Sequence, residues 1–313
     1  MISVFITILP VFLILATGYF ARRIDYLPDT IADALNIYAL KLAVPVLLFM
    51  AMYRLDFSTA FNVKMLVGYY TGALSCFVIG ITMSRILFKR RPGESVSVGF
   101  SATFSNTVLI GIPIAQLAFG DPIMAPLFGI IAFHASSLYT VGIFTMEFTR
   151  RDGRPISETA RSAVISVAAN PLFCGIVLGV ITNLIGLELP KPVEGALDMI
   201  VATAIPASLV GIGIALNRYK IKSELAESMI VCALALIVHP AIVLLLTHYV
   251  FELPIVFVQA AVLLAAMPSG MNIYIFAKLY ERAVGLSASV IVISNALSVF
   301  TITAWLLMLR GMS

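Results

Sequence analysis

The chain is a succession of long apolar runs separated by short polar stretches. Ten runs can be placed, at about 2–21, 31–53, 63–84, 96–118, 125–146, 162–183, 196–216, 228–250, 255–277 and 285–309. Each is close to the roughly 20 residues that an α-helix needs to cross the hydrocarbon core of a bilayer. The pattern therefore predicts an all-α integral membrane protein with ten transmembrane helices.

Two of these runs are interrupted near the middle by helix-breaking and amide residues. The fourth contains SNTVLIGIPI, which begins at Ser105, and the ninth contains MPSGMN, which begins at Met267. Proline has no backbone N–H and glycine loosens a helix, so both runs should form broken helices. Backbone groups freed in this way cannot face lipid, and we expect both breaks to face protein or a watery cavity.

The proline positions indicate an internal repeat. Pro10 and Pro45 are 35 residues apart, as are Pro171 and Pro206, and the second pair follows the first by 161 residues (171 − 10). The same offset carries the fourth run onto the ninth. A unit of five crossings must reappear upside down, as in the inverted repeats of secondary transporters. We therefore expect a first repeat over 1–147, a cytoplasmic loop over 148–160 and an inverted repeat over 161–313.

Composition and charge agree with a membrane protein and indicate its orientation. Hydrophobic residues make up 61% of the chain and charged residues 12%, and the mean hydropathy is +1.05. Most of the 20 lysines and arginines lie in the loops that follow the odd-numbered runs. Such loops are usually cytoplasmic, which places both termini outside the cell membrane. The net charge of +4 reflects this asymmetry, and we expect the lipid bilayer rather than a nucleic acid as partner.

The two breaks together form the predicted substrate site. A helix that restarts after a break offers N–H groups and a partial positive charge, which suit an anion such as a carboxylate. Asn106, Thr107, Ser269 and Asn272 would add side-chain donors. Gly111, Pro113, Pro268 and Gly270 would open the backbone. The alternative is that these residues only kink packed helices and hydrogen-bond between them.

Few ionisable residues lie inside the runs. Lys41 is deep in the second run, where it could act as a counter-charge, carry a proton or pair with a carbonyl for packing alone. His239 could titrate near neutral pH or serve as a hydrogen-bonding residue between helices. Asp33 and Asp198 are expected to cap helix starts. The centres of the runs contain no acidic residue, which argues against cation transport. The three cysteines have no metal-type spacing, so no cofactor is expected.

Several motifs resemble the auxin efflux carrier family, in its short-loop prokaryotic form. They are SNTVLIGIPI, AAMPSGMNIYIFAKLY, SASVIVISNALSVFTI, KLAVPVLLF and NPLFCGIVLG. The resemblance implies two inverted five-helix repeats, as in bile-acid sodium symporters and sodium/proton antiporters. Helices 4 and 9 would cross within a transport domain of helices 3–5 and 8–10. Helices 1, 2, 6 and 7 would form a scaffold that often dimerises. The family's crossover residues correspond to Asn106, Pro113, Pro268 and Asn272.

The chain departs from the family pattern at Val108 and Glu281, where members often have glycine. Family members export or exchange organic anions such as auxin, malonate or malate. The resemblance thus implies an exporter or exchanger of a small organic anion, working by an elevator-type mechanism. Sodium- or proton-coupled uptake and an anion receptor without transport remain alternatives. The chain has no HExxH or GxSxG motif and no pair of mid-membrane aspartates, so we do not expect an enzyme.

Overall fold

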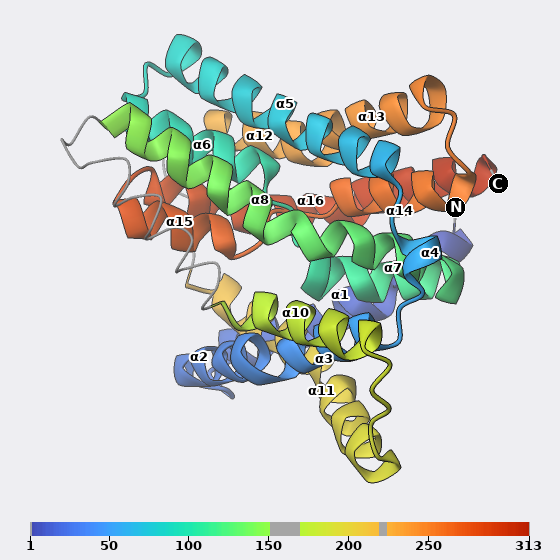
Figure 1. Ribbon diagram of the computed structural model, residues 1–313. Helices are drawn as coiled ribbons and strands as arrows, with labels where there is room; N and C mark the ends of the chain where they lie inside the picture. Colours follow the sequence, from blue (N-terminus) through green and yellow to red (C-terminus); the bar gives the residue numbers. More distant parts are fainter. Residues whose placement is uncertain (1, 151–169, 219–223, 313) are drawn as a thin grey trace. The chain divides into compact units, whose positions relative to one another are not determined.

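The computed structural model describes residues 2–150, 170–218 and 224–312, and these ranges are helical apart from turns and one isolated bridge (Figure 1). Seven helical stretches are long and apolar enough to cross a membrane: Phe5–Arg23, Asp29–Tyr53, Val63–Leu87, Asp121–Thr149, Lys191–Leu216, Leu225–Val250 and Val284–Gly311. Three apolar helices are shorter: Thr107–Phe119, Pro171–Leu184 and Ile255–Ala265. The all-α membrane class is confirmed for the described residues, while the ten crossings stay a prediction. Most of the expected connecting loop lies outside the described residues.

The contacts within the chain divide it into two units. Unit 1 comprises residues 1–8, 61–160 and 219–313, and unit 2 comprises residues 9–60 and 161–218. Both broken runs belong to unit 1. The units group segments that are far apart in the sequence, so each contains parts of both expected repeats.

Unit 1 contains most of the helices. They are α5 (Val63–Leu87), α6 (Pro92–Thr103), η2 (Thr107–Gly111), α7 (Ile112–Phe119), η3 (Asp121–Ile123), α8 (Met124–Arg150), α12 (Leu225–Ala233), η4 (Leu234–Val238), α13 (His239–Leu244), η5 (Leu245–Val250), α14 (Ile255–Ala265), α15 (Asn272–Tyr280) and α16 (Val284–Gly311). Helix α6 packs between α5 and α8, and α14 packs against α5, α8 and α16. Helix α14 is buried from Val258 to its end, which explains its continuous apolar sequence.

Unit 2 is built around close helix contacts at glycines. It contains most of α1 (Ile2–Arg23), α2 (Asp29–Tyr38), η1 (Ala39–Ala43), α3 (Val44–Tyr53), α4 (Phe57–Ala60), α10 (Pro171–Leu184) and α11 (Lys191–Leu216). A Cβ atom on Gly18 would lie 2.3 Å from the carbonyl oxygen of Val210, and one on Gly179 would lie 2.4 Å from that of Phe49. Only glycine permits such an approach of two helix backbones.

Three prolines are each preceded by a wide turn of π-helix type. Pro45 follows η1, Pro113 follows η2 and Pro240 follows η4. Proline cannot donate a backbone hydrogen bond, and the helix adapts by bonding a preceding N–H one residue further back, as from His239 N to Leu234 O. The helix therefore continues through Pro113 instead of ending there.

Two aspartates that were expected to cap helices form ion pairs instead. Asp198 lies beyond the first turn of α11 and accepts hydrogen bonds from both terminal nitrogens of Arg54, at 3.0 and 2.9 Å. Asp33 pairs with Arg218 at 2.5 and 2.9 Å. The capping prediction is wrong because the helices begin earlier, at Asp29 and Lys191.

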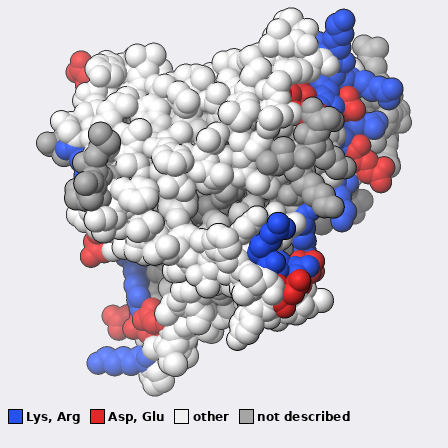
Figure 2. Space-filling model, turned by 180° about the vertical axis from the view of Figure 1, so that it is seen from behind, with Lys and Arg blue, Asp and Glu red and all other residues white. Residues whose placement is uncertain are grey.

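The charged side chains of the described residues gather in a few clusters. On the face drawn in Figure 2, blue and red residues lie together, and broad areas between them carry no charge. Many large apolar side chains are exposed, among them Ile6, Phe20, Ile181 and Phe300. Exposed apolar surface of this extent is what lipid would cover.

Candidate functional site

The first break separates α6 from the helical stretch of η2 and α7. Helix α6 ends at Thr103, and Phe104 to Asn106 are not helical. The side-chain oxygen of Asn106 accepts a hydrogen bond from the backbone N–H of Leu109 at 3.2 Å. Asn106 therefore caps the restarted helix, in the way that short polar residues usually do.

The second break separates α14 from α15. Residues 266–271 leave the helix, and α15 restarts at Asn272. Pro268 lies inside this break, where its missing N–H costs no helical hydrogen bond. Residues 266–270 are buried, whereas Met271 and Asn272 are half-buried.

The two breaks pair with each other through their backbones. Ser105 and Ser269 form an isolated antiparallel bridge. The N–H of Asn106 donates to the carbonyl of Pro268 at 2.8 Å, and the N–H of Gly270 donates to the carbonyl of Phe104 at 3.2 Å. Each break thus satisfies backbone groups that the other has freed, which lipid could not do. We call residues 104–106 and 266–271 the paired breaks.

Several hydrogen-bond donors at the paired breaks are left over. The backbone N–H groups of Val108, Met271 and Asn272 have no acceptor among the described residues. The side-chain nitrogens of Asn106 and Asn272 are also without an acceptor among the described residues, because only the side-chain oxygens of these two asparagines take part in hydrogen bonds. All four residues are half-buried. Neutral donors therefore converge beside two restarting helices, a combination suited to an anion.

The predicted site residue Thr107 follows the first break directly, and Ser269 lies within the second. Thr107 and Ser269 are buried, at 3% and 1% exposure. The Ser269 hydroxyl donates to the carbonyl of Ser101 at 3.0 Å, and its N–H donates to the Ser294 hydroxyl at 3.2 Å. Ser269 therefore has no donor to spare.

The predicted glycines and prolines allow close packing. A Cβ atom on Gly111 would lie 2.7 Å from a methyl carbon of Leu264, and one on Gly270 would lie 3.4 Å from the Cβ atom of Asn106. Pro113 and Pro268 are buried. The structure thus brings all eight predicted substrate-site residues to the paired breaks or to the turns beside them.

Tyr139 on α8 was not predicted from the sequence. Its hydroxyl donates to the side-chain oxygen of Asn272 at 3.2 Å and lies 3.5 Å from the Asn272 carbonyl. Its ring also contacts those of Phe100, Phe104 and Phe276, at centroid distances of 5.4 to 6.4 Å. A tyrosine within an apolar run gives no sequence signal that separates this role from ordinary packing.

His239 is enclosed in the interior of unit 1. It is fully buried, neither ring nitrogen has a hydrogen-bond partner among the described residues, and its ring lies 5.4 Å from that of Tyr69. Pro240 frees the carbonyl of Leu236, and the indole N–H of Trp305 donates to that carbonyl at 2.9 Å. The freed carbonyl of Leu236 is therefore bound by Trp305 and not by His239.

Lys41 belongs to unit 2 and lies in the wide turn η1 before Pro45. It is exposed and has no ion pair or hydrogen bond with another described residue. Because the paired breaks belong to unit 1, a role of Lys41 beside them stays a prediction.

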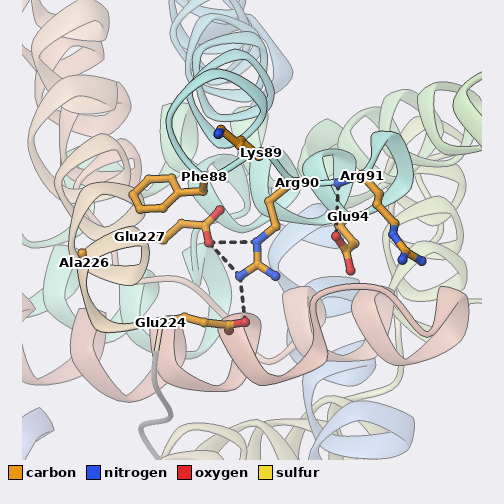
Figure 3. Close-up of a pocket in the computed structure, with 8 residues that line it drawn as sticks. All are labelled: Phe88, Lys89, Arg90, Arg91, Glu94, Glu224, Ala226 and Glu227. Carbon is orange, nitrogen blue, oxygen red and sulfur yellow. Dashed lines mark hydrogen bonds and ion pairs between the residues drawn. The ribbon is translucent and has the colours of Figure 1, made fainter.

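A charged hollow of about 410 Å³ lies elsewhere in unit 1 (Figure 3). The Arg90 guanidinium bonds Glu227 at 2.9 and 2.7 Å and Glu224 at 2.7 Å, and Arg91 points away from both glutamates. Burial lowers the pKa of Arg90, but its hydrogen bonds to Glu227 and Glu224 outweigh that effect and hold the pKa above its ordinary value. Arg90 is thus charged and already paired, and the hollow is lined by as many acidic as basic residues.

The described residues contain no group of three histidine, cysteine or acidic side chains that could hold a metal ion. The three cysteines, Cys76, Cys174 and Cys232, form no disulfide bond with one another. The donors at the paired breaks are amides and hydroxyls. Their chemistry is that of recognition by hydrogen bonds.

Comparison with known proteins identifies relatives over nearly the whole chain. Residues 3–306 match the model of a family described as membrane transport protein. A "putative malonate transporter" of Rhizobium meliloti (strain 1021) is 24% identical, over 97% of this chain and 95% of its own. An uncharacterized transporter of Methanothermobacter thermautotrophicus is 25% identical, over 96% of each chain. The uncharacterized transporter YfdV of Escherichia coli (strain K12) is 23% identical, over 98% of each chain. The chain therefore belongs to the membrane transport protein family, that of the auxin efflux carriers.

Proposed function

We propose that this membrane transport protein is a secondary transporter for a small organic anion that binds at the paired breaks. The unpaired donors of Asn106, Val108, Met271 and Asn272 carry this proposal. A carboxylate accepts several hydrogen bonds at once, and bonds to a charged group are among the stronger ones. The residues of the paired breaks include no carboxylate that would repel an anion.

The substrate class follows from the same donors and from one relative. Neutral donors and helix starts suit a carboxylate without a dedicated arginine or lysine. The relative of Rhizobium meliloti is named for malonate, so dicarboxylates of that size are the first substrates to test. Lys41 is the candidate for an additional counter-charge.

The proposed mechanism is alternating access of elevator type between two inverted repeats. Unit 1 would be the transport domain and unit 2 a scaffold that forms a homodimer. Repeated contacts support the internal repeat. The Gly18–Val210 contact recurs as Gly179–Phe49, with each glycine and its partner 161 residues from its counterpart (179 − 18 and 210 − 49).

The paired breaks join the two expected repeats. The hydrogen bonds from Asn106 to Pro268 and from Gly270 to Phe104 form one antiparallel bridge between a segment of each repeat. Export of an anion has an intrinsic driving force. Each negative charge that leaves a cell with a negative interior gains about 2.3 kcal/mol per 100 mV.

Transport by purified protein in liposomes tests this function. Radiolabelled malonate should show saturable flux, and Asn106→Ala and Asn272→Ala should each lower the flux at least about tenfold, because each removes a hydrogen bond to a charged group. Asn36→Ala is the control, since Asn36 is also a half-buried asparagine within an apolar span.

Each alternative gives a different result in the same assay. Flux that survives both asparagine substitutions would refute the site. Flux that disappears without sodium or without a proton gradient would identify coupled uptake. Saturable binding without any flux would identify a receptor.

A further inference from the structure

A buried histidine on α8 contacts both α5 and the backbone of the first break. His134 on α8 is 3% exposed. Its Nε2 atom lies 3.1 Å from the carbonyl oxygen of Ser105, and its Nδ1 atom lies 3.1 Å from the hydroxyl of Tyr69 on α5. The ring also packs edge-on against Phe104, at a centroid distance of 4.8 Å. Both ring nitrogens therefore have partners.

The partners determine which nitrogen carries the proton. The Ser105 carbonyl can only accept a hydrogen bond, so Nε2 must donate. A neutral imidazole then has an acceptor at Nδ1, and the Tyr69 hydroxyl donates to it. His134 is accordingly a neutral imidazole protonated at Nε2.

The Ser105 carbonyl belongs to the peptide unit that carries the Asn106 N–H. That N–H donates to the Pro268 carbonyl at 2.8 Å. His134 holds the oxygen of this peptide, and Pro268 receives the hydrogen bond from its nitrogen. Because a peptide unit is planar, two held ends fix its orientation and the direction in which the next Cα atom leaves. The atom so placed is the Cα of Asn106.

We propose that His134 is a positioning residue for substrate binding. It holds the Ser105–Asn106 peptide so that the Asn106 side chain is presented to the anion, and the Tyr69 hydroxyl donates to its other ring nitrogen. This inference rests on the proposed function, since it concerns the same site. His134 touches the backbone of the break and does not touch the anion.

Two amide variants separate positioning from packing. The side-chain nitrogen of glutamine lies where histidine has Nε2, whereas that of asparagine lies where histidine has Nδ1. His134→Gln should keep the bond to Ser105 and leave the KM for malonate within about threefold of the native value. His134→Asn loses that bond and should raise KM about tenfold with little change in maximal rate, the usual cost of one hydrogen bond to a site. Equal KM values for the two variants would overturn the inference.

A spectroscopic readout does not depend on transport. The chain has three histidines, so the ¹⁵N signals of His134 can be assigned by their loss in His134→Gln. The native protein should give the neutral Nε2–H tautomer. Tyr69→Phe should shift the Nδ1 signal, because that nitrogen loses its hydrogen-bond donor, while Nε2 stays protonated on the Ser105 carbonyl. An Nδ1–H tautomer or an imidazolium in the native protein would contradict the inference even if the variants failed to fold.

The two proposals fail in different ways. If the native protein transports no carboxylate but His134 shows the Nε2–H tautomer, the proposed function is refuted and the His134 contact stands. If it transports malonate and the glutamine and asparagine variants share one KM, only the role of His134 is refuted.

Discussion

Two polar regions of unit 1, the paired breaks and the hollow around Arg90, differ in how many of their hydrogen-bonding groups have partners. At the paired breaks the donors are neutral. The Asn106 side-chain nitrogen and the backbone N–H groups of Val108, Met271 and Asn272 are donors without an acceptor in the described part of the chain. In the hollow around Arg90 the groups are ionisable, and Arg90 bonds to two carboxylates. The hollow is the more conspicuous of the two, but Arg90 already has its partners. Under the proposed function, the unused donors and not the charges mark the substrate site.

The difference has a physical reason. A buried charge without a partner is costly, so it is closed by an ion pair wherever the chain can supply one. A backbone N–H or an amide carries only a partial charge, and at a half-buried position it can exchange water for substrate at low cost. A transporter must release what it binds, and several neutral donors allow this better than one tight ion pair.

Of the substitutions that distinguish the hollow from the paired breaks, Arg90→Gln is expected to have the largest effect, which is a loss of stability. Arg90→Gln leaves Glu227, whose side chain is 4% exposed, without its ion partner. The free energy of unfolding should fall by about 3 kcal/mol, as expected when one member of a buried pair is removed. Chemical denaturation in detergent measures this change, and Arg91→Gln is the exposed control.

Malonate binding by the same Arg90→Gln variant is the second measurement. We expect folded Arg90→Gln protein to bind malonate as the native protein does. A variant that stays folded and loses only its affinity would move the substrate site to the hollow.

A smaller effect on stability is expected at the wide turn before Pro240, where the Leu236 carbonyl accepts a hydrogen bond from Trp305. Trp305→Phe keeps most of the buried ring but removes the donor to the Leu236 carbonyl. One unsatisfied buried carbonyl should lower the free energy of unfolding by about 1–2 kcal/mol, with an unchanged KM. A raised KM in a variant of native stability would show that this turn also contributes to the site.

The smallest effect is expected at Ser269, although it lies inside the paired breaks. Its hydroxyl already donates to Ser101. Ser269→Ala should therefore change the KM for malonate by less than about threefold, a difference below the worth of one hydrogen bond to a charged group. An effect as large as that of Asn272→Ala would mean that Ser269 turns to the substrate, against its geometry in this structure.

The sequence predicts much of the fold because helix breakers act locally. Proline and glycine within apolar runs indicate both interrupted segments, and the structure has breaks in the same runs. The exact position of the first break does not follow from Pro113, since a wide turn absorbs that proline and the chain leaves the helix at Phe104. The offset of 161 residues carries the first break, 104–106, to 265–267, which overlaps the start of the second break at 266–271.

Contacts between distant residues were beyond prediction. The pairing of the breaks, the bond from Tyr139 to Asn272 and the bond from His134 to Ser105 all depend on which helices pack together. Asp198 illustrates the same limit, because local reasoning made it a cap while tertiary packing brought Arg54 to it.

Equilibrium binding of radiolabelled malonate tests most directly whether unused neutral donors form the anion site. Native protein and Arg91→Gln should bind malonate saturably with the same Kd, and the double variant Asn106→Ala/Asn272→Ala should bind it at least about a hundredfold more weakly, since two hydrogen bonds to a charged group are lost. An unchanged Kd in a folded double variant would contradict the account.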